Sequence, residues 1–195
     1  MMRLAWIAPL SFSLALAGCG ASDPSAPPVV TGSLEGDAAL VASAQTISDA
    51  VGGCVHAAPS KMESKVIGLE NGAIVMLACS ESEYSYTHRL FSIRAGKPPE
   101  LLSIPDYDGT WYAADQASMA ELDAGAGVLT TLRKGGGKDT CGSEGRYQWN
   151  GERFTVQEMH WQDCATTQLT GPPFPVVWPT QVGSDVDPNG ATPAP

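Results

Sequence analysis

Residues 141–164 read CGSEGRYQWNGERFTVQEMHWQDC, and this stretch indicates how the rest of the chain is built. At its centre, Asn150-Gly151 favours a two-residue type I′ turn, because both residues tolerate a positive φ. A turn there predicts a β-hairpin. The expected cross-strand pairs are Tyr147 with Phe154 and Trp149 with Glu152.

The predicted hairpin has one apolar face and a cysteine beyond each arm. Side chains alternate along a strand, so one face carries Tyr147, Trp149, Phe154 and Val156. Cys141 and Cys164 are placed to close the open end of the ribbon. We therefore expect a sheet that grows from a disulfide-closed hairpin.

The composition favours one globular domain with short strands. The chain has 195 residues, of which 43% are hydrophobic and 16% are charged, which suits a single domain with polar extensions. Its 21 glycines and 15 prolines favour turns and short strands over long helices.

The N-terminal segment has the features of a bacterial lipoprotein signal peptide over residues 1–18. Arg3 supplies the positive charge, and Leu4 to Leu16 form an apolar run that is too short to span a bilayer. The run ends in Leu16-Ala17-Gly18-Cys19, which resembles the lipobox of bacterial lipoproteins. Cys19 would then carry a diacylglyceride and an amide-linked acyl chain such as palmitate. The alternative is an ordinary signal peptide cleaved near Ala17, with Cys19 incidental.

The predicted location of the protein is the cell envelope. Two or more acyl chains anchor a protein stably to a membrane. Gly20, rather than aspartate, follows the cysteine, and by resemblance to the enterobacterial sorting rule this predicts the outer membrane, facing the periplasm. Loss of Arg3 changes the formal charge of −10 to about −11. That charge disfavours nucleic acid and favours cationic partners, although it also simply keeps an exported protein soluble.

The order of elements along the chain predicts an α+β domain over residues 37–181. Residues 19–36 read as the lipidated cysteine and a disordered tether, and residues 182–195 as a disordered tail. A helix is expected from Asp37 to Val51, because Leu40, Ala44, Ile47 and Val51 recur at helical spacing. Gly52-Gly53 would end it.

Strand patterns follow the helix. A second hairpin is expected from Lys65 to Leu69 and Ala73 to Cys79, with its turn at Asn71-Gly72 and apolar residues on both faces. Further strands are expected over residues 84–94, 101–104, 127–133 and 176–178, the last at a sheet edge. Residues 105–109 read as a loop, and residues 111–122 as a segment with a short helix that turns Met119 and Leu122 inward.

Four cysteines remain besides Cys19, and in an exported protein an even number implies disulfides. Spacing favours Cys54–Cys79 and Cys141–Cys164, because each pair brackets its own hairpin. Each would close a loop of about 25 residues and stabilise the fold by roughly 3.5 kcal/mol.

The chain resembles the C-terminal half of a bacterial envelope family labelled domain of unknown function 1176. The resemblance rests on residues 147–154 (YQWNGERF), on a glycine-rich loop leading to Cys141-Gly142, on Cys164 and on the closing Pro175-Val176-Val177-Trp178. It covers about residues 40–180. The chain departs from the family pattern at Thr140, where Asp usually precedes Cys, and at Ala165-Thr166, where Arg-Gly is expected. The N-terminal half that many relatives carry is not recognised here. The family implies no settled activity.

Catalytic and cofactor motifs are not recognised. Gly135-Gly136-Gly137-Lys138 lacks the frame of a phosphate-binding loop. His56, His88 and His160 do not have metal-ligand spacing. Asp106, Asp108 and Asp115 lack calcium-loop spacing and read as turn aspartates. We therefore expect no cofactor and no metal.

An acidic and aromatic rim beside Cys79 is the candidate binding surface. It consists of Glu81, Glu83, Tyr84 and Tyr86, and tyrosine is enriched at interfaces.

The sequence thus predicts a non-enzymatic, lipid-anchored envelope protein with an α+β fold. The fold is a single domain with a twisted, mainly antiparallel sheet of about five to seven strands, built from Asn-Gly hairpins, with one packed helix and two disulfides. It would bind or scaffold an unknown periplasmic protein or ligand, and the acidic charge favours a cationic one. The alternative is an inhibitor of a cationic cell-wall hydrolase such as lysozyme. An enzyme using His88, His160 or Asp139 is the third hypothesis.

Overall fold

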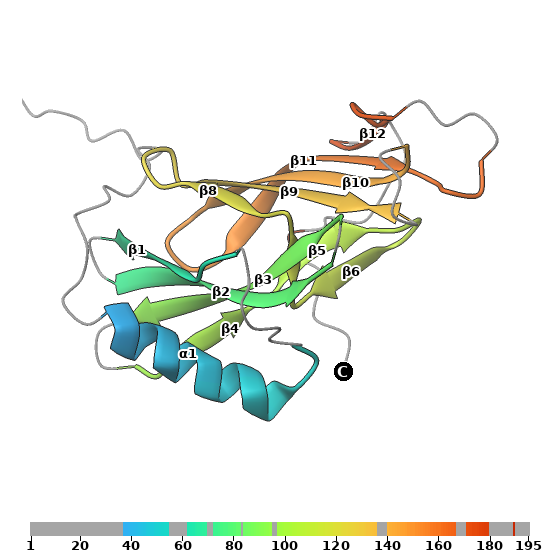
Figure 1. The fold of residues 1–195 in the computed structure, drawn as a ribbon. Coiled ribbons are helices and arrows are strands. Elements are labelled where there is room, and N and C mark those ends of the chain that lie inside the picture. Colours follow the sequence, from blue (N-terminus) through green and yellow to red (C-terminus); the bar gives the residue numbers. More distant parts are fainter. Residues whose placement is uncertain are drawn as a thin grey trace, which may run out of the picture.

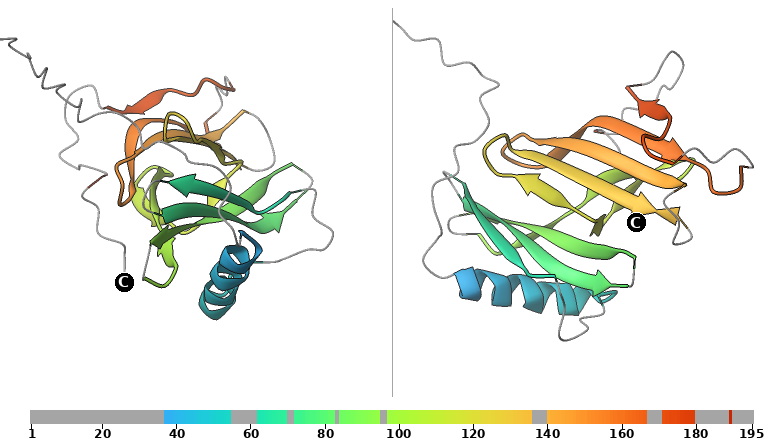
Figure 2. Two further views of the ribbon diagram at one scale, coloured as in Figure 1. Left: turned by 90° about the vertical axis from the view of Figure 1, so that its left-hand side faces the viewer. Right: turned by 45° about the horizontal axis from the view of Figure 1, so that its top comes forward.

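The computed structural model describes residues 37–54, 62–69, 72–82, 84–94, 97–135, 140–166, 171–179 and 189. Within these residues, one helix and twelve strands form two five-stranded antiparallel sheets and a two-stranded ribbon. Figure 1 shows three layers, with the helix under one sheet and the second sheet above it, and Figure 2 shows the same order from two further sides. The prediction of a mainly antiparallel β fold with one helix is confirmed. The prediction of a single sheet of five to seven strands is wrong, because two sheets share the core.

The helix α1 (Asp37–Val51) has the predicted bounds. It ends at Gly52 and Gly53, whose φ angles of 76° and 81° are left-handed, and the Gly52 N–H donates to the Ser48 carbonyl at 3.0 Å. Ala44 and Ser48 are buried, and Leu40 and Ile47 pack on the sheet. Val51 was expected on the packed face but is 55% exposed, because the last helical turn meets a polar guanidinium, that of Arg89.

The helix-covered sheet has the order β1-β2-β3-β4 and is antiparallel throughout. The short strand β7 also pairs with β3. Both faces are apolar, as predicted: Val75, Leu77 and Phe91 pack under α1, and Ile74, Met76 and Leu90 face the other sheet. The strands are β1 (Lys65–Leu69), β2 (Gly72–Glu81), β3 (Tyr86–Arg94), β4 (Glu100–Leu102) and β7 (Ala117–Ser118).

The turn between β1 and β2 differs from the prediction. Leu69 pairs with Gly72, so Gly72 belongs to β2 rather than to the turn. Asn71 lies outside the described residues.

The outer sheet has the order β12-β11-β10-β9-β8. The strand predicted over 127–133 and the edge strand predicted over 176–178 are both present. The strands are β8 (Glu121–Asp123), β9 (Val128–Lys134), β10 (Gly142–Trp149), β11 (Phe154–Gln162) and β12 (Val176–Trp178).

The β10–β11 hairpin turns through four residues rather than two. Trp149 pairs with Phe154, and Tyr147 pairs with Val156, so both predicted pairs are wrong by two positions. The reason is local: the Asn150 side-chain oxygen accepts hydrogen bonds from the N–H groups of Glu152 (3.0 Å) and Arg153 (2.9 Å). A shift of two residues keeps the face of each side chain, so the four predicted apolar residues still share the buried face.

A two-stranded ribbon replaces the predicted loop at residues 105–109 and the predicted helix in 111–122. It consists of β5 (Ile104–Tyr107) and β6 (Trp111–Ala114), and it joins one sheet to the other. Leu122 packs against the core, as expected, but from strand β8 rather than from a helix.

The two disulfides join the predicted cysteines. Cys54 binds Cys79 and ties the chain after α1 to β2, whereas Cys141 binds Cys164 and closes the open end of the β10–β11 hairpin. In the parts of the chain that the structure describes, no helix is both long enough and apolar enough to cross a bilayer.

Candidate functional site

An open groove of about 990 Å³ lies where the core between the two sheets ends. One wall comes from the helix-covered sheet and the other from the region of β8 and the end of β9. We call it the rim groove. Its lining residues are Met62, Glu63, Lys65, Glu81, Ser82, Tyr84, Ser85, Tyr86, His88, Met119, Ala120, Glu121, Leu122 and Lys134.

Three of the four rim residues predicted from the sequence line this groove. Glu81 ends β2 and pairs with Tyr86 at the start of β3. Tyr84 lies between the two strands and is 59% exposed. Glu83 lies outside the described residues. The structure therefore places Glu81, Tyr84 and Tyr86 around one cavity.

The turn that carries these residues is held by hydrogen bonds between serines. The Ser82 N–H donates to the Ser85 carbonyl at 2.7 Å, and the Ser85 N–H donates to the Ser82 hydroxyl at 3.1 Å. The Ser80 and Thr87 hydroxyls lie 2.6 Å apart across the strands. The Cys54–Cys79 disulfide anchors the same strand end, so this wall of the groove is firmly positioned.

His88 forms part of the groove lining and is only 2% exposed. Its ring meets that of Tyr86 edge-on, with centroids 5.7 Å apart. Within the described residues, neither ring nitrogen has a hydrogen-bond partner. A neutral imidazole carries one donor and one acceptor, so this side chain leaves two buried polar atoms unsatisfied.

Burial is the largest influence on His88 and lowers its pKa. The Glu63 backbone opposes this effect and raises the pKa, and the charge on Lys65 lowers it further. Burial therefore favours the neutral form of the imidazole.

The opposite wall is apolar near the core and charged near solvent. Met119 has a φ of 43°, which is uncommon for a residue with a side chain, and its N–H donates to the Tyr86 carbonyl at 2.8 Å. Ala120 is buried and Leu122 is half-buried. Glu121 is exposed on β8, which forms the edge of the outer sheet.

The charges of the groove are mixed, with a small negative excess. Three carboxylates, of Glu63, Glu81 and Glu121, line it together with two ammonium groups, of Lys65 and Lys134. Sequence reasoning did not find Glu63, Lys65, Glu121 or Lys134, because they come from separate segments and no motif connects them.

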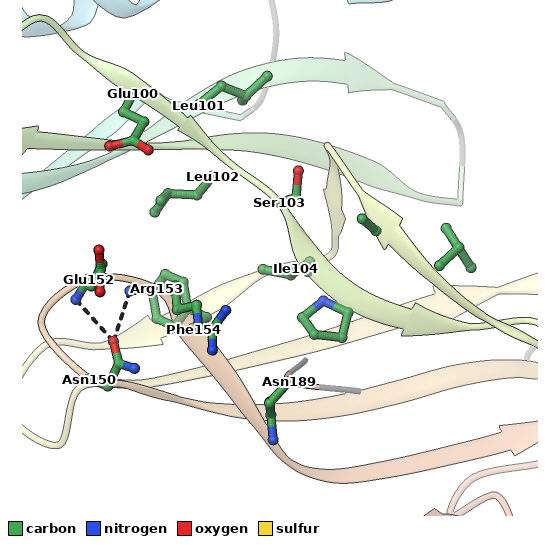
Figure 3. A pocket seen from close by; sticks show the side chains of 13 residues that line it. Glu100, Leu101, Leu102, Ser103, Ile104, Asn150, Glu152, Arg153, Phe154 and Asn189 are labelled. Atoms are coloured by element: carbon green, nitrogen blue, oxygen red, sulfur yellow. Dashed lines mark hydrogen bonds between the residues drawn. The ribbon is translucent and has the colours of Figure 1, made fainter. Parts of the chain in front are cut away.

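A second pocket of about 530 Å³ lies between β4–β5 and the β10–β11 turn. Figure 3 shows Leu102, Ile104 and Phe154 inside it, with Asn150 bonded to the backbone of the turn. Asn189 closes one side, since its side-chain oxygen accepts the Val156 N–H at 2.7 Å. Among the described residues, none of the buried polar atoms without a hydrogen-bond partner belongs to this pocket.

Asp106 was predicted to be a turn aspartate, but it lies in strand β5 and accepts several hydrogen bonds. Its carboxylate accepts hydrogen bonds from Tyr112 (2.7 Å), Ser143 (2.9 Å) and Arg133 (3.1 Å). Burial, followed by the Asp106 charge, raises the pKa of Tyr112 and of buried Tyr147. These contacts fasten the β5–β6 ribbon to the outer sheet.

The other candidate ligands lie apart. Asp115 pairs with Arg89 at 2.7 Å, and Asp108 lies on an exposed turn. His160 lies between the Phe174 carbonyl (2.7 Å) and Glu158 (2.9 Å). Although burial lowers the pKa of His160, these two partners outweigh it and raise the pKa. Among the residues that the structure describes, no three His, Cys, Asp or Glu side chains gather as metal ligands.

Several predicted features lie outside the described residues. These are Cys19 and the leader, His56, residues 136–139 of the glycine-rich loop, and most of the tail.

Comparison with known proteins identifies the family. The profile of "Protein of unknown function (DUF1176)" matches residues 21–181. The uncharacterized protein YpfG of Escherichia coli (strain K12) is 24% identical over 128 residues, which is 63% of this chain and 37% of that protein's length. No solved structure matches. The chain therefore belongs to the DUF1176 family, as the motifs around residues 147–154 and the closing Trp178 predicted.

Proposed function

We propose that this chain is a lipid-anchored cell-envelope protein that binds a partner through the rim groove and catalyses no reaction. The observation that carries the proposal is His88, which is buried in the wall of the groove and whose two ring nitrogens have no hydrogen-bond partner among the described residues. An unsatisfied buried polar group costs about 1–3 kcal/mol. A partner that hydrogen-bonds the imidazole would recover part of that cost.

The remaining features of the groove also favour binding. An exposed tyrosine such as Tyr84 offers a large contact area at low entropic cost, and tyrosine is enriched at interfaces. A cavity of about 990 Å³ falls at the upper end of the roughly 300–1,000 Å³ range of ligand sites. Positioned hydroxyls and a disulfide hold one wall, so little ordering is needed on binding.

The anchor part of the proposal rests on Leu16-Ala17-Gly18-Cys19. Residues 20–36 would link the lipid to α1. They lie outside the residues that the structure describes.

Intact-mass spectrometry of membrane-extracted protein tests the anchor. The expected product begins at Cys19 and carries lipid, and the Cys19→Ser variant should lose both the lipid and membrane retention. An unmodified full-length chain would refute the anchor.

Photo-crosslinking in cells tests the binding groove. A benzophenone amino acid at Tyr84 should yield a discrete adduct, whereas the same group at Val176 should not. Val176 is a matched control, because it is 50% exposed and lies on β12, at the opposite edge of the outer sheet from β8. The same adducts from both positions, or none from Tyr84, would refute the groove as a binding site.

A second function, inhibition of a cationic cell-wall hydrolase, is favoured by the acidic balance. The chain carries a net charge of −10, and three carboxylates line the groove. A lysozyme assay at low salt and micromolar protein tests it. Inhibition that weakens in Glu81→Gln would support this function, and full lysozyme activity would exclude it for lysozyme.

A further inference from the structure

We infer that the rim groove takes a basic peptide segment, whose backbone amide bonds His88 and whose arginine or lysine side chain lies among Tyr84 and the rim carboxylates. This deepens the function proposed above and rests on it. The inference draws on three features of the groove: an imidazole without hydrogen-bond partners among the described residues, an exposed tyrosine and three carboxylates in the lining.

The imidazole of His88 indicates a ligand that both donates and accepts hydrogen bonds. In its neutral form it offers one N–H and one bare nitrogen, and both lack partners within the described residues. A peptide unit offers one N–H and one carbonyl, so an extended segment carries both kinds of group that the two nitrogens lack. A simple cation can satisfy at most the bare nitrogen, and an apolar ligand can satisfy neither.

Tyr84 and Tyr86 favour a positively charged side chain above the imidazole. Tyr84 is 59% exposed beside the groove, and Tyr86 lines it next to His88. A guanidinium or ammonium group over an aromatic face gains cation–π attraction. The exposed carboxylates of Glu63, Glu81 and Glu121 line the same groove and would pair with that charge.

The electrostatics predict weak, salt-sensitive binding. Lys65 and Lys134 reduce the local excess to one negative charge, because three carboxylates face two ammonium groups. The whole-chain charge of −10 adds long-range attraction for a cation. Since the Debye length is about 8 Å at physiological salt, much of that attraction disappears there.

The test uses the full chain, exported by a bacterial host and purified in mild detergent. The probes are three fluorescent five-residue peptides that differ only at the central position: Ac-Gly-Ala-Arg-Ala-Gly and its Gln and Glu counterparts. Anisotropy at low salt gives the affinities, and NMR of the His88 ring reports the location. We expect the Arg peptide to bind at least tenfold more tightly than the Glu peptide and to shift the His88 resonances.

Two kinds of variant separate the two contacts. Tyr84→Ala combined with Glu81→Gln changes exposed side chains and should bring the Arg affinity within about threefold of the Gln affinity. His88→Leu should weaken all three peptides by a similar factor and leave the Arg-to-Glu ratio unchanged. Thermal unfolding checks that each variant folds.

The outcomes distinguish this inference from the proposed function. If the three peptides shift His88 equally, the groove binds peptides, but a basic one is not preferred, and the inference fails alone. If no peptide binds while the Tyr84 crosslink forms in cells, the ligand is of another class and the inference again fails alone. If no peptide binds and the Tyr84 crosslink also fails to form in cells, both this inference and the proposed function are refuted.

Discussion

The guanidinium of Arg89, which is 1% exposed, donates to the Asp115 carboxylate at 2.7 Å although half of that aspartate side chain lies in solvent. Its other terminal nitrogen donates to the Ser48 carbonyl (2.9 Å) and hydroxyl (3.0 Å), and the Gly52 carbonyl accepts a further bond. One side chain of β3 thus fastens the end of α1 and the segment before β7.

Removal of Asp115 should destabilise the fold by about 2 kcal/mol. In the described part of the chain, the Asp115→Ala variant leaves the buried Arg89 charge with only neutral partners. Removing one partner of a fully buried ion pair costs roughly 3–5 kcal/mol. The cost should be smaller here, because the Asp115 side chain is half-exposed. Urea unfolding measures the loss. The control is Asp108→Ala, because in the described part of the chain that exposed carboxylate accepts only a long hydrogen bond from Thr110, at 3.4 Å. The stability of this variant should stay within about 0.5 kcal/mol of the native value. Equal losses in both variants would contradict this account.

Asp106→Asn should cost about 2–4 kcal/mol, because the amide NH₂ group would face some of the four donors from which the carboxylate now accepts hydrogen bonds: the Tyr107 N–H, Tyr112, Arg133 and Ser143. Tyr112→Phe removes a single bond from the same centre and should cost about 1 kcal/mol. Chemical denaturation of both variants gives the comparison. If Asp106→Asn leaves the free energy of unfolding unchanged, the carboxylate does not hold the β5–β6 ribbon in place.

The features that sequence reasoning predicted well depend on local patterns. Helix 37–51 follows from the spacing of its apolar residues and the two glycines after it. The disulfides follow from the placement of each cysteine pair around one hairpin. Even the wrong register at Asn150 preserved the buried face, since a shift of two positions keeps side-chain orientation.

The features that it missed depend on contacts between distant residues. Asp106 meets Arg133 and Ser143, which lie 27 and 37 residues further along the chain. Such bonds turn a proline- and aspartate-rich stretch, which reads as a loop, into strand β5. The rim groove was found only on its β2–β3 side, because Glu121 and Lys134 reach it through the packing of a second sheet that no local pattern predicts.

Loss of either disulfide should destabilise the protein to a similar extent. The two bonds close loops of similar size, with sequence separations of 25 and 23, and the chain-entropy model gives about 3–3.5 kcal/mol for each. Paired serine variants at 54 and 79, or at 141 and 164, allow this to be measured by unfolding without reductant. A loss near zero for one pair would show that its loop is already constrained in the unfolded chain.

His88→Leu should stabilise the fold by about 1–2 kcal/mol at pH 6.5, because leucine has a similar size and removes two unsatisfied buried nitrogens. It should also change the pH dependence of stability. Burial lowers the pKa of His88 in the folded state, with Lys65 adding to the effect and the Glu63 backbone opposing it. The other charged or titratable side chains lining the groove are Glu63, Glu81, Tyr84, Tyr86, Glu121 and Lys134.

The sign of this pH dependence follows from proton binding. Between the lowered folded pKa and the unfolded value of 6.5, the unfolded chain binds more protons at position 88 than the folded chain does. The free energy of unfolding of the native protein should therefore fall as the pH drops below about 6.5, and His88→Leu should lack this component. Urea titrations of both proteins at intervals from pH 7 to pH 5 measure the difference. If the free energies of unfolding of the two proteins change with pH in parallel, burial does not lower the pKa of His88 in the folded state. The argument for a ligand at this ring would then lose its physical basis.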